Sequence, residues 1–410
     1  MKVLVVGGGS GGHITPAVAT IRELLKKNSR TKVEFWTDRK YYKNVVKITT
    51  EIGIKWGHEE RAKQEYIRVR KIFAGKFHRY AGWTWRMYFE RLDITFRDLI
   101  WGNIVGFCGF VAGIVQSFCR LIRKDSRPDV IFLKGGFVGL PVGIVAGVLR
   151  IPYVIHESDA VPGLANRILM KHAKVVAMGM DFEEQVGREN WEWVGIPIAE
   201  EFTKVGVRRE KELKKVFGFD PEKPLVVITG GSQGAENINL AVREILPDLL
   251  KITSVGLVAG RKHYEDMVDL KKYEEWEEAD LKSNFRMWEF NSAMHELMGA
   301  ADVVVSRAGA TTIAELSALE KAVILIPFEK LPGGHQVKNA EKLAKDGAAV
   351  SLLDSKMTKK PTLLLEEIKK LIKDGKNREE LAKKLHSEAK QDAAEKLAEI
   401  LIRVAGNEKR

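Results

Sequence analysis

The sequence predicts an α/β protein of two domains, each built on a doubly wound parallel sheet. Short apolar, β-branched runs alternate with longer helical patterns, and this alternation occurs in both halves of the chain. Three of these runs end in a glycine turn that leads into a helix, at residues 7–12, 230–235 and 306–315. A chain of 410 residues, 45% of them hydrophobic, has room for two such cores.

The expected strands of each half follow the chain in order, each a short apolar run. Those of the first half are Lys2–Val6, Val33–Thr37, Val130–Leu133, Tyr153–His156, Val175–Met178 and Trp193–Val194. After a solvated linker and helix at 199–223 the pattern restarts. The second series is Leu225–Thr229, Ser254–Ala259, Phe285–Phe290, Ala301–Ser306 and Ala322–Pro327. Residues 39–80 have no periodicity that predicts an element, whereas 362–405 predict amphipathic surface helices. We expect the two sheets to face each other across a cleft.

The first glycine turn predicts a phosphate or diphosphate site. Glycines let the backbone approach a ligand closely, and the helix that follows presents unpaired N–H groups and a partial positive charge. The turn fits the G-x-G-x-x-G pattern, but two features speak against NAD. Asp38 lies in a basic stretch rather than at a clean strand end, and His13 stands at the mouth of the turn. His13 is either a reactive group or a helix-start histidine that packs on the turn.

The net charge of +12 favours anionic partners, which could be phosphates, nucleic acid or anionic lipid. The two cysteines, Cys108 and Cys119, lie in an apolar stretch and are expected to be reduced, buried thiols of a cytoplasmic protein. The N-terminus runs directly into a strand, so no signal peptide is expected. No cysteine and histidine spacing typical of zinc sites occurs.

One apolar segment is unusual for a soluble domain. Leu99–Cys119 carries no charge over its 21 residues, and an aromatic and arginine-rich stretch, Tyr80–Arg97, precedes it. Its length and apolarity meet the threshold for a transmembrane helix, and Gly102/Gly106 and Gly109/Gly113 give small-xxx-small spacings. A helix lying at the membrane surface, or a core helix, remain the alternatives.

Further chemistry is expected where strands end. His156, Glu157 and Asp159 follow a buried strand of the first half, which is where open α/β sheets hold their reactive groups. In the second half Thr311 and Thr312 begin a helix after the third glycine turn, and hydroxyls plus helix N–H groups suit a diphosphate.

Three more polar side chains of the second half could bind hydroxyl groups of a ligand. Glu315 lies one turn inside the helix, where a carboxylate can accept from both hydroxyls of a ribose, or else stabilise the helix start. Gln336 and Asn339 follow a glycine loop, and amides suit sugar hydroxyls, although ordinary turn chemistry would also explain them.

Six motifs in order resemble one enzyme family. They are GGSGGH, KGGFVGLP, HESDAVPGLANR, GGSQGA, SRAGATTIAE and GGHQVKNA. The set resembles the undecaprenyl-diphospho-muramoylpentapeptide β-N-acetylglucosaminyltransferases of peptidoglycan synthesis, over nearly the whole chain. The resemblance implies a GT-B fold with Rossmann-like domains. It implies an acceptor and membrane-facing domain at 1–198, a UDP-GlcNAc-binding domain at 199–387, and a C-terminal helix at about 388–410 that returns to the first domain.

The resemblance also implies roles for single residues. Ser10, Gly11 and Gly12 would lie at the diphosphate end of the cleft, with His13 near the acceptor hydroxyl and Glu157 or Asp159 orienting or replacing it. Ser232, Thr311, Thr312 and Glu315 would hold the uridine diphosphate, and Gln336 and Asn339 the GlcNAc. The chain departs from the family at Ser158 and Asp159, where Gln and Asn are usual, and at Ala199, where many members carry arginine.

The implied reaction is inverting transfer of GlcNAc from UDP-GlcNAc to the 4-hydroxyl of a lipid-diphosphate-linked muramoyl peptide. Helix N-termini can stabilise the departing diphosphate, so neither a tightly bound metal nor another cofactor is expected. The lipid tail of the acceptor implies a peripheral protein on the cytoplasmic leaflet, held by anionic lipid. Two rivals stay open: another UDP-sugar enzyme, such as a glycolipid glycosyltransferase or an epimerase, and a non-enzymatic protein that binds anionic lipid. Nucleic acid is not expected as a partner.

Overall fold

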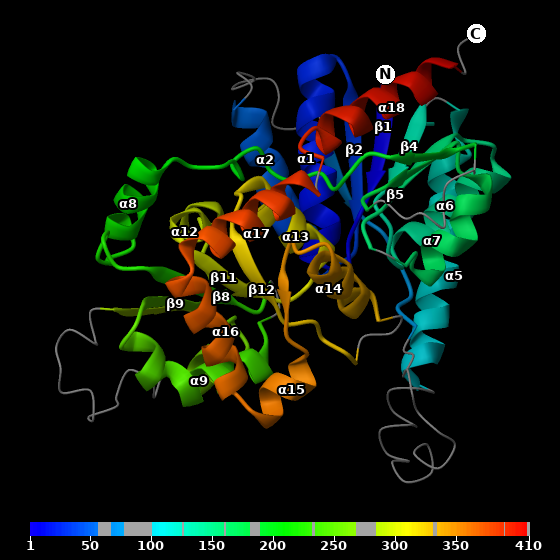
Figure 1. Ribbon diagram of the computed structural model, residues 1–410. Coiled ribbons are helices and arrows are strands. Elements are labelled where there is room, and N and C mark those ends of the chain that lie inside the picture. The colour runs from blue at the N-terminus through cyan, green and yellow to red at the C-terminus, as the bar shows by residue number, and fades with distance from the viewer. Residues whose placement is uncertain are drawn as a thin grey trace. The chain divides into compact units, whose positions relative to one another are not determined.

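The chain folds into two compact units, each built around a parallel sheet (Figure 1). The first unit comprises Met1–Ala199 and Lys390–Arg410, and the second comprises Glu200–Ala389. This computed structural model describes residues 1–55, 67–77, 101–124, 127–159, 161–180, 189–231, 234–267, 284–330, 334–388 and 390–407.

The described part of the first unit holds a seven-stranded, all-parallel sheet. In sheet order its strands are β3 (Ile67–Lys71), β2 (Lys32–Thr37), β1 (Lys2–Val6), β4 (Val130–Leu133), β5 (Tyr153–Glu157), β6 (Val175–Met178) and β7 (Trp191–Trp193). The order reverses beside β1, so the carboxyl ends of β1 and β4 form the switch point where open α/β sheets bind ligands. The helices are α1 (Gly11–Lys27), α2 (Tyr42–Lys55), α5 (Gly102–Leu121), α6 (Gly139–Val148), α7 (Leu164–Leu169), η3 (Met170–His172) and α18 (Ala393–Asn407).

The C-terminal helix α18 packs on α1, far from it in sequence (Figure 1). Leu397 and Leu401 are fully buried in the same apolar cluster as Ile21 of α1. Burying a leucine side chain contributes about 1.5–3 kcal/mol, so this contact anchors the chain end. Lys390 joins the helix to the sheet, because its ammonium lies 3.9 Å from the ring centroid of Trp193 and donates to the carbonyl of that residue.

The described part of the second unit holds a six-stranded, all-parallel sheet. Its strands, in sheet order, are β10 (Phe285–Trp288), β9 (Ser254–Val258), β8 (Leu225–Thr229), β11 (Val303–Ser306), β12 (Ala322–Leu325) and β13 (Val350–Ser351). Its helices are α8 (Val207–Val216), α9 (Glu236–Leu250), α10 (Tyr264–Met267), α12 (Met294–Ala300), α13 (Ala310–Ala318), α14 (His335–Lys345), α15 (Asp354–Lys359), α16 (Thr362–Lys373) and α17 (Gly375–Ser387).

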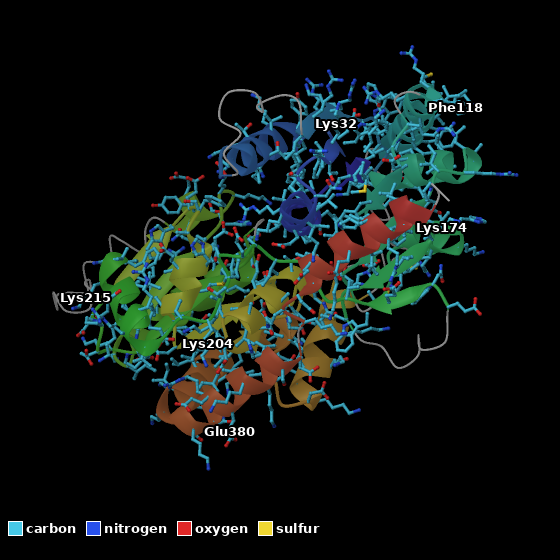
Figure 2. All side chains as sticks on the ribbon, turned by 90° about the horizontal axis from the view of Figure 1, so that it is seen from above. Lys32, Phe118, Lys174, Lys204, Lys215 and Glu380 are labelled. Atoms are coloured by element: carbon cyan, nitrogen blue, oxygen red, sulfur yellow. The ribbon has the colours of Figure 1, made fainter. Side chains whose placement is uncertain are left out.

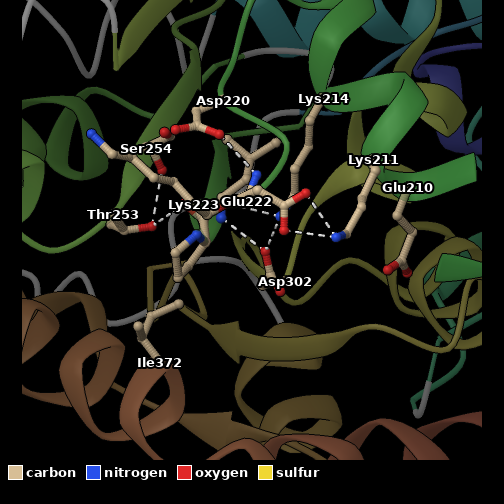
Figure 3. Close-up of polar contacts among 12 residues, drawn as sticks. Glu210, Lys211, Lys214, Asp220, Glu222, Lys223, Thr253, Ser254, Asp302 and Ile372 are labelled. Carbon is tan, nitrogen blue, oxygen red and sulfur yellow. Dashed lines mark hydrogen bonds and ion pairs between the residues drawn. The ribbon is translucent and has the colours of Figure 1, made fainter. Parts of the chain in front are cut away.

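An internal ion pair fastens α8 to the start of this sheet (Figure 3). The buried Lys214 ammonium donates to the Asp302 carboxylate at 2.8 Å and to the carbonyl of Lys223 at 2.9 Å. The same carboxylate oxygen accepts from the backbone N–H of Leu225, the first residue of β8. Because a buried charge is tolerated only when it is paired and hydrogen-bonded, this lysine is a structural one.

The predicted fold class is confirmed, since the chain alternates strands and helices around two parallel sheets. Each predicted strand is present, with ends that differ by at most two residues. The elements that were not predicted include α2 and β3 in the stretch 39–80 and the short strand β13. β3 reads Ile-Arg-Val-Arg-Lys, a half-polar edge strand whose alternation is masked by its basic side chains.

The apolar segment forms α5, and this helix is not a core helix. It is long and apolar enough to cross a membrane by length and composition, yet only 22% of its apolar window is buried within the protein. The expectation that Cys108 and Cys119 are buried is wrong, since both thiols are exposed. They lie on the face of α5 that no described element covers, which hydropathy alone could not reveal.

The glycines of α5 serve a contact inside the unit. A Cβ at Gly106 would lie 2.8 Å from the carbonyl oxygen of Lys76, and one at Gly113 would lie 2.3 Å from that of Phe73. The segment after β3 therefore lies directly on the helix backbone. Gln116 completes the contact, because its side-chain oxygen accepts from the N–H of Phe73 at 2.8 Å. These glycines thus let two backbones approach closely, as small residues do between membrane helices.

Candidate functional site

The first glycine turn, which follows β1, packs closely against Asp38. The N–H of Gly9, which has φ +79°, donates to the Asp38 carboxylate at 3.1 Å. A Cβ at Gly8 would lie 2.5 Å from that carboxylate. Asp38 therefore binds the turn itself rather than standing free for a ribose, which agrees with the exclusion of NAD. Ser10, Gly11 and Gly12 lie partly exposed at the start of α1, and Ser10 makes no capping bond with its side chain.

His13 lies on the second glycine turn, which follows β4. Its ring approaches Gly136 so closely that a Cβ there would lie 3.1 Å from Nε2. Gly135 is packed in the same way against Asn166, whose Nδ2 would lie 2.8 Å from such a Cβ. Both glycines have positive φ, so only glycine combines this conformation with this space. At the switch point, His13 of α1 and Asn166 of α7 thus both contact the turn after β4, although these residues lie far apart in the sequence.

The electrostatics of His13 favour the neutral ring. Burial, followed by the positive charge of Lys134, lowers the pKa of His13 to about 4, and a polar contact with the Lys134 backbone opposes this. Its Nδ1 is enclosed and has no hydrogen-bond partner among the described residues. An imidazole that is neutral at pH 7 can accept a proton, so the geometry is compatible with a general base.

Glu157 is buried, and its carboxylate is saturated by internal donors. One oxygen accepts from the N–H of Asp159 at 3.0 Å, and the other accepts from Gly163 N–H at 3.1 Å and from Asn166 Nδ2 at 2.8 Å. Burial and then the Asp159 charge raise the pKa of Glu157, while these hydrogen bonds act against the rise. The carboxylate shapes the loop between β5 and α7, which favours a positioning role for it.

His156 is a second internal brace. It is fully buried, and burial together with the Lys134 charge holds its pKa well below the usual range, so the ring is neutral. Its Nε2 donates to the carbonyl of Gly195 at 2.8 Å, which ties β5 to the loop after β7. Asp159, by contrast, is only partly buried at the rim of this loop.

In the second unit, the glycine turn after β8 is equally tight. A Cβ at Gly230 would lie 2.2 Å from the N–H nitrogen of Ala235, and Gly234 has φ +75°. The helix α9 follows at once, so its N–H groups point into the turn. Ser232, the predicted diphosphate ligand of this turn, lies outside the described residues.

The start of α13 leaves several polar groups open. Thr311 and Thr312 lie partly exposed in its first turn, after the cap residue Gly309. Glu315 lies one turn further, partly buried, and no hydrogen-bond donor or cation of the described chain contacts its carboxyl. Burial raises the pKa of Glu315 to about 8. An acid that is buried without a partner is a candidate ligand contact, because a bound donor would stabilise its charge.

The amides of α14 divide into two kinds. Asn339 is 1% exposed, and its Nδ2 donates to the carbonyl of Ala308 at 3.2 Å, so it braces the turn before α13. Gln336 lies partly exposed, and its side-chain oxygen accepts from the N–H of Phe328 at 2.9 Å. Its NH₂ group is therefore the part that remains for a ligand.

Sequence reasoning missed two charged residues near these turns. Lys134 directly follows the last residue of β4 and is 1% exposed. Arg307 follows β11 and donates to the Asp354 carboxylate at 2.5 Å, which braces the third turn. The available signal was similar for both, namely a charge placed immediately after a short, mostly apolar strand. No group of three or more His, Cys, Asp or Glu side chains within the described residues is placed to hold a metal ion.

Family models of glycosyltransferases match both parallel-sheet units. Residues 3–178 match the glycosyltransferase family 28 N-terminal domain, and residues 225–397 match the glycosyltransferase family 28 C-terminal domain. The crystal structure of Acinetobacter baumannii MurG superposes with a TM-score of 0.65 at 22% identity, covering 98% of this chain and 99% of that one. This likeness supports the GT-B fold.

Two curated relatives identify the family. A UDP-N-acetylglucosamine–N-acetylmuramyl-(pentapeptide) pyrophosphoryl-undecaprenol N-acetylglucosamine transferase of Thermoanaerobacter sp. strain X514 is 32% identical over 98% of this chain and 99% of its own length. The enzyme of the same name from Listeria welshimeri is 33% identical over the same shares. The chain belongs to this family of N-acetylglucosaminyltransferases, and the resemblance of its six motifs is confirmed.

Proposed function

We propose that this chain transfers GlcNAc from UDP-GlcNAc to the 4-hydroxyl of a lipid-diphosphate-linked N-acetylmuramoyl peptide, with inversion at the anomeric carbon. The observation that carries the donor assignment is the start of α13, where two threonine hydroxyls, helix N–H groups and an unpartnered, partly buried carboxyl lie close together. The hydroxyls and N–H groups suit the diphosphate, and Glu315 suits the ribose.

The first unit supplies the proposed acceptor side. Partly exposed N–H groups at the start of α1 are suited to the acceptor diphosphate, and His13 follows them directly. A neutral His13 takes the proton of the attacking hydroxyl while UDP leaves from the opposite face of the sugar. Asp159, at the rim of the β5 loop, orients the acceptor or the imidazole. Glu157 and His156 keep the loop in place.

The assay follows from the reaction. Purified protein is incubated with UDP-[¹⁴C]GlcNAc and a lipid-linked muramoyl pentapeptide, and label in the lipid fraction is counted. We expect label transfer together with equimolar UDP, and neither without acceptor. Conversion of UDP-GlcNAc to another UDP-sugar in the absence of acceptor would instead identify an epimerase, and the absence of any donor turnover would refute the proposal.

We further propose that α5 docks the protein on the cytoplasmic leaflet of the membrane. Large apolar side chains of this helix are exposed, among them Phe107 at 58% and Phe118 at 41%, and so is Trp101, directly before it, at 60%. Figure 2 labels Phe118 at the outer edge of the first unit. Exposed Arg123 and Lys124 follow the helix and suit anionic headgroups. The aromatic and arginine-rich stretch Tyr80–Arg97 lies outside the described residues.

Membrane docking fits the proposed substrate, because a polyprenyl tail leaves a bilayer only at a large free-energy cost. The test is flotation with vesicles of phosphatidylglycerol and phosphatidylcholine, compared with phosphatidylcholine alone. We expect the protein to float with the anionic vesicles at low salt and to be released as salt rises. Protein that stays wholly in the soluble fraction at low salt would refute the docking.

A further inference from the structure

Lys134 is the buried charge of the first unit that the proposed reaction has not used. The side chain is 1% exposed at the junction of β4 with the Gly135–Gly136 turn. Its ammonium donates to Ser158 Oγ at 2.7 Å, on the loop after β5. A buried ammonium is costly unless compensating charges face it, so the groups around it matter.

The charged and titratable groups that face Lys134 come from two elements. Glu157 and Asp159, at the end of β5, act on the lysine with opposite charge, and both raise its pKa against the dominant lowering by burial, which leaves it at about 8. His13 of α1 and His156 of β5 feel the ammonium as a positive charge that lowers their pKa values. The charge of Lys134 therefore acts both on the proposed base, His13, and on the carboxylates of Glu157 and Asp159.

We propose that Lys134 is a positioning residue for the transfer reaction: its ammonium is the internal counter-ion of the Glu157–Asp159 loop and, through Ser158, fixes that loop against the turn on which His13 rests. This inference rests on the proposed function for its consequence in catalysis. The positioning itself follows from the geometry, because Lys134 lies two residues before Gly136, which contacts the His13 ring, while its side chain donates to Ser158 on the next loop.

Two consequences separate this role from mere packing. The Asp159 carboxylate stabilises the charged form of Lys134, so neutralising Asp159 removes part of the interaction that Lys134 makes with this loop. The same positive charge keeps a proton off His13, so removing it raises the pKa of His13. An apolar packing role predicts neither effect.

The experiment compares Lys134→Met, Asp159→Asn and the double variant, with Lys214→Met as a matched control. Lys214 is also a buried, ion-paired lysine, but it lies in the second unit. The His13 ring is titrated by NMR in ¹³C-histidine-labelled protein, thermal unfolding is recorded, and transfer is assayed. We expect Lys134→Met to raise the pKa of His13 by about one pH unit. We expect the variant to lower kcat roughly 10–100-fold, because the loop and the base lose their alignment.

In the Asp159→Asn background, Lys134→Met should lower kcat by only roughly threefold or less, since the two changes act on one interaction. Lys214→Met should lower the melting temperature without moving the titration of His13. The proposal is overturned if Lys134→Met lowers the melting temperature but leaves both the His13 titration and kcat unchanged, or if its effect on kcat is the same in both backgrounds.

Two further outcomes keep the inference separate from the proposed function. If the wild-type protein transfers no GlcNAc, the proposed function fails, whereas the titration of His13 still tests the charge relation. If Lys134→Met does not fold alone but folds together with Asp159→Asn, the rescue itself supports the counter-ion role. Failure of both the single and the double variant to fold refutes it.

Discussion

The unpartnered Glu315 carboxyl leads to a prediction about stability and pH. Burial raises the pKa of Glu315 from its usual 4.5 to about 8. A carboxyl whose pKa is raised on folding binds its proton more tightly in the folded state, so the folded state loses stability as pH rises from about 4.5 to about 8. Replacing Glu315 by Gln removes the ionisation. We therefore expect the variant to resist alkaline pH better than the wild-type protein.

The magnitude follows from the two pKa values. They differ by about 3.5, and each pH unit corresponds to about 1.4 kcal/mol, so the largest possible effect is about 5 kcal/mol. The side chain is partly exposed, and water screens the charge. We therefore expect an effect on the order of 2 kcal/mol between pH 5 and pH 9.

The assay is urea unfolding of both proteins at pH 5 and pH 9, with Glu341→Gln as the control. Glu341 is an exposed glutamate on α14 of the same unit, so its removal should leave the pH dependence of the wild type intact. The reasoning also predicts that UDP binding releases a proton near pH 7.5, because ribose hydroxyls stabilise the ionised form. Equal pH dependence in wild type and Glu315→Gln would refute the account of this carboxyl.

Three further predictions concern the first unit. His13→Ala should lower kcat by about 10²–10⁴-fold. The UDP affinity, measured by titration calorimetry, should change by less than about twofold, because the base does not bind the donor. Near-normal turnover would exclude His13 as the base. Glu157→Gln should lower the free energy of unfolding by about 1–3 kcal/mol, because an amide cannot accept from all three donors, and an unchanged urea midpoint would contradict its bracing role. Phe107→Ser with Phe118→Ser should weaken flotation with anionic vesicles, whereas Phe290→Ser, equally exposed in the second unit, should not.

The fold was predictable because strand and turn signals are local. An apolar β-branched run, a glycine with positive φ and a helix start lie within about fifteen residues of one another, so a single stretch predicts a complete β-turn-α unit. The elements that were missed have weaker local signals. β3 alternates apolar with basic residues, and its place at the sheet edge comes from its pairing with β2, which the sequence does not encode locally.

The exposure of α5 could not be predicted from the sequence either. Hydropathy identifies an apolar helix but not which neighbour covers it. Three of the four glycines that gave the small-xxx-small spacings, Gly106, Gly109 and Gly113, contact residues 73–76 of the same unit. The exposed side chains of the helix include Phe107 and both cysteines instead. The contact partner, 30 residues away in the chain or more, is a property of the tertiary structure alone.

The hydrogen bonds distinguish the motif residues by degree. Asp38 and Glu157 accept hydrogen bonds from groups of their own unit, on turns and loops that they hold in place. His156 and Asn339 also make such a bond, but each keeps a second polar atom, Nδ1 or Oδ1, without a partner in the described chain. His13 Nδ1 likewise has no partner there, and no described donor or cation contacts the Glu315 carboxyl.

An unsatisfied buried polar atom costs about 1–3 kcal/mol unless a ligand or water completes it. Folding alone gives no reason to retain that cost, whereas binding does. We therefore expect truncation of Asp38 or Glu157, whose polar groups are engaged inside their own unit, to lower stability more than ligand affinity. Truncation of His13 or Glu315 should do the reverse, because we propose that these two side chains contact the substrates.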